Sequence, residues 1–447
     1  MTNKIVTFPN RTKIQNHIIL SLKRYWQKNE NYIDSLPIIK KDKDLIIKLP
    51  LKLIEVSLPA WASKWGVEGK LLIPQELAPN IKTIDKNNEW KNIDWFLVIF
   101  VMMESWHERE WEIMHGTIHS YSFRLRGWDT RIWDRAWVNR IALFMREWAA
   151  YNHNTTANDL LGTLPLNNII MTHDVDAIKK TINIRIKQGG FIVFNIIRLL
   201  FHFKITAAIK KTQQFLKFLF SQENWWQFEY LLSTEAIAGI KSVFHFYAPS
   251  HKKTLKNWIF DPGYSIHQPI LKDLILKIKN DGHQIGLHPS FESWNDLNSI
   301  IDQKEKLEAI LKKPVFACRQ HWLRFSWSLT WSAQQGAGLN LDRTLMFNDR
   351  PGFRNASAIC WRPWNIEVNT NWNLSAQTTV LMDSHFYDYQ LLSDLQRKDH
   401  ICYWINECQA VHGETAVLWH PHTLSSDYGW KEGFKELLNA ISQKKII

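Results

Sequence analysis

From about residue 166 onward, the chain alternates between short apolar runs and longer segments with helical spacing. Segments such as 269–280 and 297–312 repeat apolar residues every three or four positions, which is typical of amphipathic helices. Continuous apolar runs are typical of strands that are buried on both faces of a parallel sheet. The pattern therefore predicts an α/β fold with a parallel barrel. The six predicted strands are 169–172, 243–247, 284–287, 315–318, 379–382 and 416–419.

The first 165 residues have a different pattern. Mixed apolar and polar segments come first, and two long apolar stretches at 95–104 and 136–146 have helical spacing. We therefore expect an N-terminal α/β accessory domain, residues 1–165, followed by a barrel domain, residues 166–447. No catalytic combination of residues stands out in the first domain, which favours a packing or substrate-gating role.

Residues 177–222 form an insertion between the first two predicted strands. The insertion has nine basic residues and no acidic ones, and large apolar side chains lie between the basic ones. Such a segment, at 185–220, has the composition that an interfacial helix on an anionic membrane needs. The alternative is a packed helical hairpin whose lysines extend to solvent. Nucleic acid is not an expected partner, because no nucleic-acid-binding motif accompanies the charge.

The composition of the chain bears on its binding partners and on its cellular compartment. The 447 residues have a formal net charge of +12, which suits an anionic partner without selecting one. The four cysteines make no disulfide framework and lack the paired spacing of a structural zinc site. The sequence has no signal peptide and no run of about 18 apolar residues. We expect a cytoplasmic protein, with peripheral contact to the inner face of the membrane as a further option.

Polar residues capable of chemistry follow the predicted strands. Asp174 and Asp176 come after the first strand and point to the same face, which suits one metal ligand and one general base. The alternative is that both aspartates cap a turn. The end of a barrel strand is also where catalytic residues gather. The other candidates are His288, Glu292, Arg319, His321 and His420.

These segments resemble the motifs of the polysaccharide deacetylase superfamily, the NodB-homology domain. Its first motif, Thr-Phe-Asp-Asp-Gly, is similar to the segment Thr-His-Asp-Val-Asp at 172–176. The resemblance implies that Asp174 is the catalytic base and Asp176 a metal ligand, or the reverse. The second motif resembles Gly-His-Gln-Ile-Gly-Leu-His at 282–288, which implies that His288 binds the metal. Glu292 occupies the position of the family's second histidine.

The remaining motifs extend the resemblance to about residue 430. The family's Arg-x-Pro resembles the segment 319–321, which implies that Arg319 pairs with the catalytic aspartate. His321 replaces the proline, and either His321 or His173 could supply the missing nitrogen ligand. Val-Leu-Trp-His at 417–420 resembles the fifth motif, so His420 would be the general acid. Asp342 matches the aspartate that supports this acid, and Asp383 is the alternative.

The resemblance implies an irregular (β/α) barrel of NodB-homology type in a divergent branch with an added N-terminal domain. It implies a metal-dependent hydrolase that removes an acetyl group from an N-acetylated sugar. A divalent ion is expected, with zinc, cobalt and nickel all compatible. Another amide hydrolase on the same barrel, or an inactive carbohydrate-binding relative, are the alternatives. The candidate substrate contacts are Ser290, Trp322, Leu418 and Trp419.

Overall fold

The computed structural model describes residues 8–37, 47–78, 86–201, 203–249, 254–390 and 392–443. The chain divides into two compact units, and both are discontinuous in sequence. The first unit contains Met1–Ile170, Trp322–Leu381 and Tyr403–Val417. The second unit contains Met171–His321, Met382–Cys402 and Leu418–Ile447. The predicted domain boundary at 165 stays a prediction, and both units draw on segments from beyond it.

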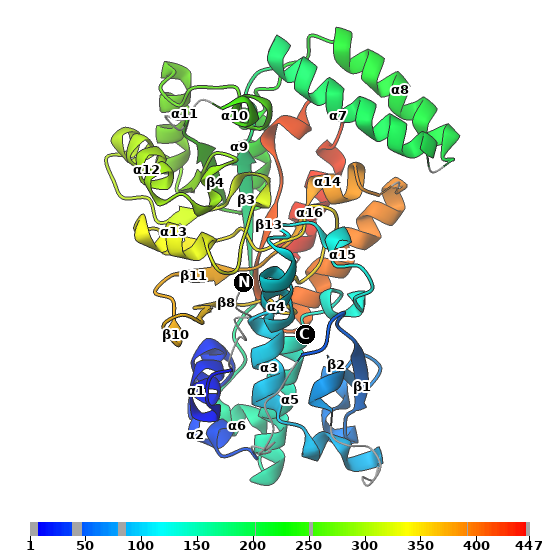
Figure 1. Ribbon diagram of the computed structural model, residues 1–447, viewed down its shortest axis with the longest axis vertical. Coiled ribbons are helices and arrows are strands. Elements are labelled where there is room, and N and C mark those ends of the chain that lie inside the picture. The colour runs from blue at the N-terminus through cyan, green and yellow to red at the C-terminus, as the bar shows by residue number, and fades with distance from the viewer. Residues whose placement is uncertain are drawn as a thin grey trace. The chain divides into compact units, whose positions relative to one another are not determined.

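The predicted α/β class is confirmed by a nine-stranded sheet whose strand order is β12-β13-β3-β4-β5-β6-β7-β11-β8 (Figure 1). The strand pairs from β3 to β6 are parallel, and so is the pair β7–β11. β12 and β8 are the two ends of this order, so the irregular barrel is an open one. The strands that matter for the site are β3 (Asn168–Val175), β4 (Val243–Tyr247), β5 (Gln284–His288), β6 (Ala317–Cys318), β12 (Thr379–Met382) and β13 (Glu414–Leu418). The sheet also contains β7 (Leu341–Asp342), β8 (Cys360–Trp361) and β11 (Ser375–Gln377).

Amphipathic helices connect the strands of the second unit. α11 (Pro269–Asn280) has proline at its first position, where the missing N–H costs no hydrogen bond. Leu271, Leu274, Ile275 and Ile278 recur every three or four positions and are buried. α12 (Leu297–Leu311) begins at Asp296, whose carboxylate accepts a hydrogen bond from the backbone N–H of Ser299 at 3.1 Å. Both helices lie where the apolar spacing predicts them. The unit also contains α9 (Phe228–Ile237), α10 (Leu255–Phe260), α14 (Asp383–Tyr387) and α16 (Lys431–Ser442). α15 (Asp394–Ala410) begins in this unit, and its residues from Tyr403 onward belong to the first unit.

The first unit has a largely helical core. Every residue of α3 (Trp95–Met103) is buried, as expected for a helix that is apolar on all sides. α5 (Trp137–Asn152) and the antiparallel pair β1 (Leu53–Ser57) and β2 (Lys70–Pro74) belong to the same unit. The other elements of the unit include α1 (Arg11–Ser21), α4 (Trp106–His115) and α6 (Ala157–Leu161). Many of the chain's tryptophans serve as core residues here, including Trp26, Trp95, Trp106, Trp133 and Trp331.

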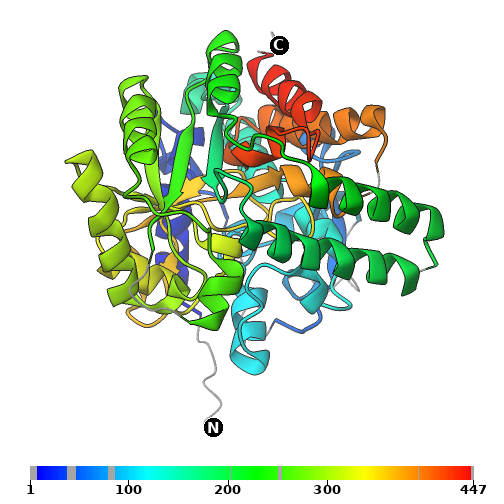
Figure 2. The same ribbon diagram turned by 90° about the horizontal axis from the view of Figure 1, so that it is seen from above.

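The insertion predicted at 177–222 is a helical hairpin. α7 (Ile182–Phe201) and α8 (Ile205–Phe220) run side by side, as both ribbon views show (Figures 1 and 2). The hairpin belongs to the second unit. In the described part of the chain, no helix has both the length and the apolar composition that are needed to cross a membrane.

Candidate active site

The candidate site is built at the ends of adjacent parallel strands in the second unit. In the register of the sheet, Asp174 of β3 lies opposite His245 of β4, and His245 lies opposite Gly286 of β5. His288 is the last residue of β5, and Arg319 directly follows β6. Because parallel strands end on the same edge of a sheet, these side chains meet although they are far apart in sequence.

Asp176, His288 and His321 form a cluster that could hold a metal ion, with their donor atoms all within 4.8 Å of one another. Nε2 of His288 lies 3.2 Å from Oδ1 of Asp176, and Nδ1 of His321 lies 3.4 Å from the same oxygen. Both imidazoles are buried, and the Asp176 side chain is 28% exposed. The cluster therefore combines two enclosed nitrogen donors with a carboxylate that solvent can reach.

The outer nitrogens of both histidines are held by backbone carbonyls. Nδ1 of His288 donates to the carbonyl of Arg319 at 2.7 Å, and Nε2 of His321 donates to the carbonyl of Phe260 at 2.8 Å. These bonds leave the inner nitrogens, which face Asp176, as lone-pair donors in the neutral rings. Metal-binding histidines characteristically donate their other N–H in this way.

The electrostatic environment of the cluster would stabilise a bound cation. Oδ1 of Asp176 is buried and has no hydrogen-bond donor among the described residues. Burial opposes ionisation of Asp176, but His321 and His288 outweigh it and hold the carboxyl pKa well below its usual range. Burial likewise lowers the pKa of His321, yet the Asp176 carboxylate reverses this and raises it. Two imidazoles and one carboxylate with room for further ligands fit zinc, cobalt or nickel.

Asp174 lies next to this cluster as a buried, ionised carboxylate. Its Oδ1 accepts hydrogen bonds from Nδ1 of His245 at 3.0 Å and from the Arg319 guanidinium at 3.1 Å. Arg319 is fully buried and also donates to the hydroxyl of Thr172 at 2.7 Å. Burial would raise the pKa of Asp174, but the charges of Arg319 and His288 and the bond from His245 lower it far more. The predicted pairing of Arg319 with Asp174 is present in the structure.

His245 is a site residue that the sequence analysis missed. It lies in the middle of the run 243–247, where an alternating aromatic pattern suggests a core strand. The sequence feature that could have identified His245 is Gly286, which lies opposite it on the neighbouring strand. A Cβ on Gly286 would come 2.6 Å from Cδ2 of His245 and 3.1 Å from the carbonyl of Ala317. Gly286 therefore makes the space that the imidazole occupies beside Asp174.

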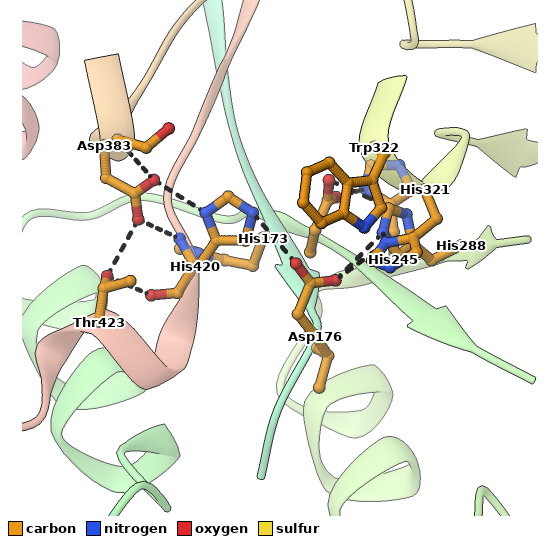
Figure 3. Close-up of polar contacts among 12 residues, drawn as sticks. His173, Asp176, His245, His288, His321, Trp322, Asp383, His420 and Thr423 are labelled. Atoms are coloured by element: carbon orange, nitrogen blue, oxygen red, sulfur yellow. Dashed lines mark hydrogen bonds and ion pairs between the residues drawn. The ribbon is translucent and has the colours of Figure 1, made fainter. Parts of the chain in front are cut away.

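His420 approaches the cluster from the other side (Figure 3). Its Nδ1 donates to Oδ1 of Asp383 at 2.8 Å, and its backbone N–H donates to Oδ2 of Asp383 at 2.9 Å. Its Nε2 lies 3.5 Å from Oδ2 of Asp176. Burial would lower the pKa of His420, but the Asp383 and Asp176 carboxylates raise it to about 9. The ring is thus a proton donor held by Asp383, whose Oδ2 also accepts a bond from the Thr423 hydroxyl at 3.0 Å.

Asp342 does not support His420, contrary to its assignment by sequence resemblance. Its carboxylate belongs to the first unit, where it accepts hydrogen bonds from Trp331 at 3.1 Å, from Gln334 at 2.9 Å and from the Thr344 hydroxyl. Burial raises the pKa of Asp342 despite these donors. Asp383, the alternative named from the sequence, takes the supporting position because β12 neighbours β13 in the sheet.

Two of the candidate ligands lie outside the cluster. Nδ1 of His173 contacts the carbonyl of Trp419 at 2.7 Å, and Nε2 contacts the carboxylate of Glu235 at 2.8 Å. Both nitrogens of this buried ring are therefore engaged away from the cluster. Glu292 accepts a hydrogen bond from the Thr254 hydroxyl at 2.9 Å and pairs with Lys256 at 3.4 Å. His321 takes the place that was considered for these two residues.

The predicted substrate contacts differ in accessibility. Trp419 and Leu418 are buried, so Trp419 offers no open ring face to a sugar in this structure. Trp322 follows His321 directly and has a left-handed backbone, with φ of 56°. Ser290 and Glu292 both line a polar cavity of about 280 Å³ after β5. Its other lining residues are Asn257, Ser293, Asn295, Asp296 and Ser299.

No protein-family model matches the sequence, and no curated protein matches it. Solved structures that are similar include a putative polysaccharide deacetylase from Mycobacterium smegmatis, at 16% identity and a TM-score of 0.36, covering 62% of this chain and 84% of that one. A chitin deacetylase from Colletotrichum lindemuthianum has 12% identity and a TM-score of 0.31, covering 62% and 85%. A wild-type CE4 family pseudoenzyme from Bacillus anthracis has 11% identity and a TM-score of 0.26, covering 65% and 68%.

These neighbours come from the superfamily that the sequence motifs resemble. Their names include both deacetylases and a pseudoenzyme, and all three TM-scores are below 0.5. The likeness therefore does not decide whether this chain is active. That question depends on the residues of its own site.

Proposed function

We propose that this protein is a metal-dependent hydrolase that removes the acetyl group from an N-acetylated sugar. The observation that carries the proposal is the position of Asp176 between two sets of residues. On one side it contacts His288 and His321, and on the other it lies 3.5 Å from the His420 imidazole. A base, a ligand cluster and an acid are therefore contiguous, as hydrolysis of an amide requires.

Asp176, His288 and His321 would hold the divalent ion. Such an ion supplies Lewis-acid polarisation of the amide carbonyl and lowers the pKa of water. The loss of the family's second motif histidine is the reason to consider an inactive relative. Here His321, in the turn after β6, offers the second imidazole instead, so the donor set would not need Glu292.

Asp174 would act as the base that takes a proton from the attacking water. Arg319 and His245 hold one of its oxygens at 3.1 and 3.0 Å, which fixes the carboxylate and keeps it ionised. The other oxygen, Oδ2, lies 3.9 Å from Nδ1 of His288 and is the one available for the proton. Arg319 and His245 are positioning residues in this scheme, since they act through Asp174.

His420 would protonate the departing amine. The Asp383 carboxylate accepts the Nδ1 proton, so that Nε2 is the nitrogen that presents a proton toward Asp176 and the reacting centre. With a pKa of about 9, the ring is charged at neutral pH and ready to donate. Asp383 stabilises that charge and sets the orientation of the ring.

A sugar is the proposed substrate because of the polar cavity after β5. Hydroxyl, amide and carboxylate groups line this cavity, and some of the lining residues are close to a cluster residue along the chain. Ser290, two residues after His288, is one of its lining residues. Such groups suit the hydroxyls of a pyranose.

The test is acetate release from N-acetylglucosamine oligomers by the protein loaded with zinc, cobalt or nickel. We expect acetate from the wild type, and none above background from Asp174→Asn or His288→Ala. Glu305→Gln is the matched control, because it alters an exposed carboxylate of α12 that belongs neither to the ligand cluster nor to the polar cavity. Ammonia or ring opening from small amides, with no acetate from sugars, would identify a different amide hydrolase. Wild-type turnover in both site variants would refute the mechanism.

A further inference from the structure

The first helix of the α7–α8 hairpin exposes a continuous apolar stripe. Ile182, Ile186, Val193, Ile197 and Leu200 recur at helical spacing, and all of them are exposed. Residues spaced by three, four or seven positions share one side of a helix. Phe201, at the end of the same stripe, is 79% exposed. A soluble helix normally turns such a face toward the core, so this face is available for another surface.

The second helix repeats this arrangement. Ile205, Ile209, Leu216 and Phe220 are separated by four, seven and four positions and are all exposed. Phe203, in the turn between the helices, is 89% exposed. The hairpin is also internally packed, because a Cβ on Gly189 would lie 3.2 Å from the Phe215 ring. The two helices thus hold together through one set of contacts and leave large apolar side chains outside.

Basic residues flank these stripes, and nothing in the hairpin balances them. Arg198, Lys204, Lys210 and Lys217 have no acidic partner among the described residues. Lys211 pairs with Asp388 of α14 at 3.0 Å. The whole segment 177–222 contains no Asp or Glu. An apolar stripe with cations on its flanks is the pattern of helices that lie in the headgroup region of anionic bilayers.

The positive charge of the hairpin favours an anionic bilayer over a second copy of the chain as the partner of this surface. A second copy of the chain on the same face would bring two sets of unbalanced lysines together, and like charges at an interface are unfavourable. A bilayer rich in anionic lipid offers both the apolar interior and the opposite charge. The hairpin would lie on such a bilayer, since neither of its helices is suited to crossing one.

The base of the hairpin is attached to both sides of the candidate site. Lys187 of α7 donates to the carbonyl of Asp261 at 3.0 Å, and the neighbouring carbonyl of Phe260 is the one that holds His321. Lys180, just before α7, is buried and pairs with Asp427 at 2.7 Å. Asp427 follows His420 on the same loop.

Two further features lie at this base. A cavity of about 90 Å³ is lined by Ala177, Ile184 and Tyr264, among others, directly after the strand that carries Asp176. Trp258 of α10 is 50% exposed, and the Lys187 amine lies 5.6 Å from its ring centre. A half-exposed tryptophan beside a lysine is typical of the headgroup level of a membrane.

From these contacts we propose that the α7–α8 hairpin docks the protein on the surface of an anionic bilayer, and that the candidate site receives a lipid-carried N-acetylated sugar there. The first half of this proposal stands on the hairpin alone. The second half rests on the proposed deacetylase function, because the hairpin's attachments flank His321 and His420.

The experiment measures flotation of the full-length chain with phosphatidylcholine vesicles, with and without phosphatidylglycerol. We expect binding only to the anionic vesicles and release by high salt, because headgroup attraction is screened. Changing Ile186, Ile197 and Ile209 together to Gln should weaken binding by at least about tenfold. Changing Lys204, Lys210 and Lys217 together to Gln should do the same, since it removes three cations that attract anionic headgroups.

Matched variants make the comparison specific. Ile237, Ile270 and Leu395 are exposed apolar residues on other helices, and their triple change to Gln should leave binding unchanged. The exposed Lys272, Lys313 and Lys398 serve in the same way for charge. Asp174→Asn should bind vesicles like the wild type. Equal binding by the hairpin variants and their controls, or an apolar-stripe-dependent dimer that ignores vesicles, would overturn the docking proposal.

Turnover measurements distinguish the docking proposal from the proposal of a lipid-carried substrate. The hairpin variants should release acetate from soluble N-acetylglucosamine oligomers at the wild-type rate. They should be at least about tenfold slower on an N-acetylglucosaminyl lipid in anionic vesicles. Equal rates on the vesicle substrate would refute the lipid-carried substrate while leaving docking intact. Failure of the wild type on every acetylated sugar would refute the proposed function without affecting the flotation result.

Discussion

Nε2 of His288 lies 2.8 Å from Nδ1 of His321, and the other nitrogen of each ring is bonded to a backbone carbonyl. Two lone pairs therefore face each other beside the Asp176 carboxylate, unless a proton or a metal ion lies between them. This relationship makes the cluster a candidate metal site whose two imidazoles come from the end of β5 and from the turn after β6.

Metal binding is expected to depend on both imidazoles. His288→Ala or His321→Ala should reduce zinc affinity, measured by competition with a chelating dye, by at least about a hundredfold, because even outer-shell partners are worth ten- to hundredfold. Glu292→Gln should bind zinc like the wild type. Loss of binding in Glu292→Gln with retention in His321→Ala would show that the ligand set has been assigned wrongly.

The Asp174 carboxylate is expected to be needed for turnover and not for metal retention. Asp174→Asn keeps the shape of the side chain but cannot accept a proton from water, so kcat should fall by at least about a hundredfold. Zinc content after gel filtration should stay at the wild-type level. A variant that loses its metal together with its activity would instead identify Asp174 as a ligand.

The pH dependence of His420 follows from its carboxylate partners. In the metal-free protein its pKa, measured by histidine NMR, should be near 9, because Asp383 and Asp176 stabilise the charged ring. A general acid works while it is protonated, so activity should be lost as pH rises through the pKa of this ring. Asp383→Asn removes one negative charge and should move that alkaline limb to lower pH. An unchanged limb in Asp383→Asn would exclude His420 as the acid.

Gly286 is expected to be intolerant of a side chain. Gly286→Ala would place its Cβ 2.6 Å from the His245 ring and 3.1 Å from a backbone carbonyl, so we expect a loss of about 1–3 kcal/mol of unfolding free energy in urea. Gly190→Ala is the control, because its Cβ would meet no atom within 4 Å. In the middle of α7 that change should stabilise slightly, by about 1 kcal/mol. Similar effects at the two glycines would contradict the close approach of His245.

A buried histidine of the first unit should make folding sensitive to acid. His107 is fully buried, and burial lowers its pKa from 6.5 to about 3. The unfolded chain therefore binds one more proton than the folded one between these values, so stability falls as pH drops below 6.5. His107→Leu should reduce the slope of unfolding free energy against pH by about 1.4 kcal/mol per pH unit in this window. An identical slope in both proteins would count against the burial of a neutral ring.

The ends of the strands could be predicted from the sequence because a buried parallel strand is a recognisable run of apolar residues and a polar residue follows it. Asp174, His288, Arg319 and His420 were found in this way. His245 was not, since a histidine inside a strand cannot be distinguished from a core residue without its neighbour strand. The choice between Asp342 and Asp383 likewise required the strand order. Only the sheet brings β12 beside β13 and so brings Asp383 to His420.

The burial of individual aromatic residues could also not be predicted from the sequence. Trp419, a candidate substrate contact from the sequence, is a buried core residue in the structure, as are Trp327, Trp331, Trp361 and Trp364. A tryptophan's position in sequence does not reveal which of its faces is covered, because that depends on packing partners that are distant along the chain. His173 was misjudged for the same reason, since its partner Glu235 lies on α9.

His321, the second imidazole of the cluster, lies in the turn after β6, two residues after the buried Arg319. The two imidazoles therefore come from chain positions that are 33 residues apart. Pattern searches that demand both histidines within one helical turn would pass over such chains and score them as inactive. A pattern that also accepts Arg-x-His in place of Arg-x-Pro would retrieve them.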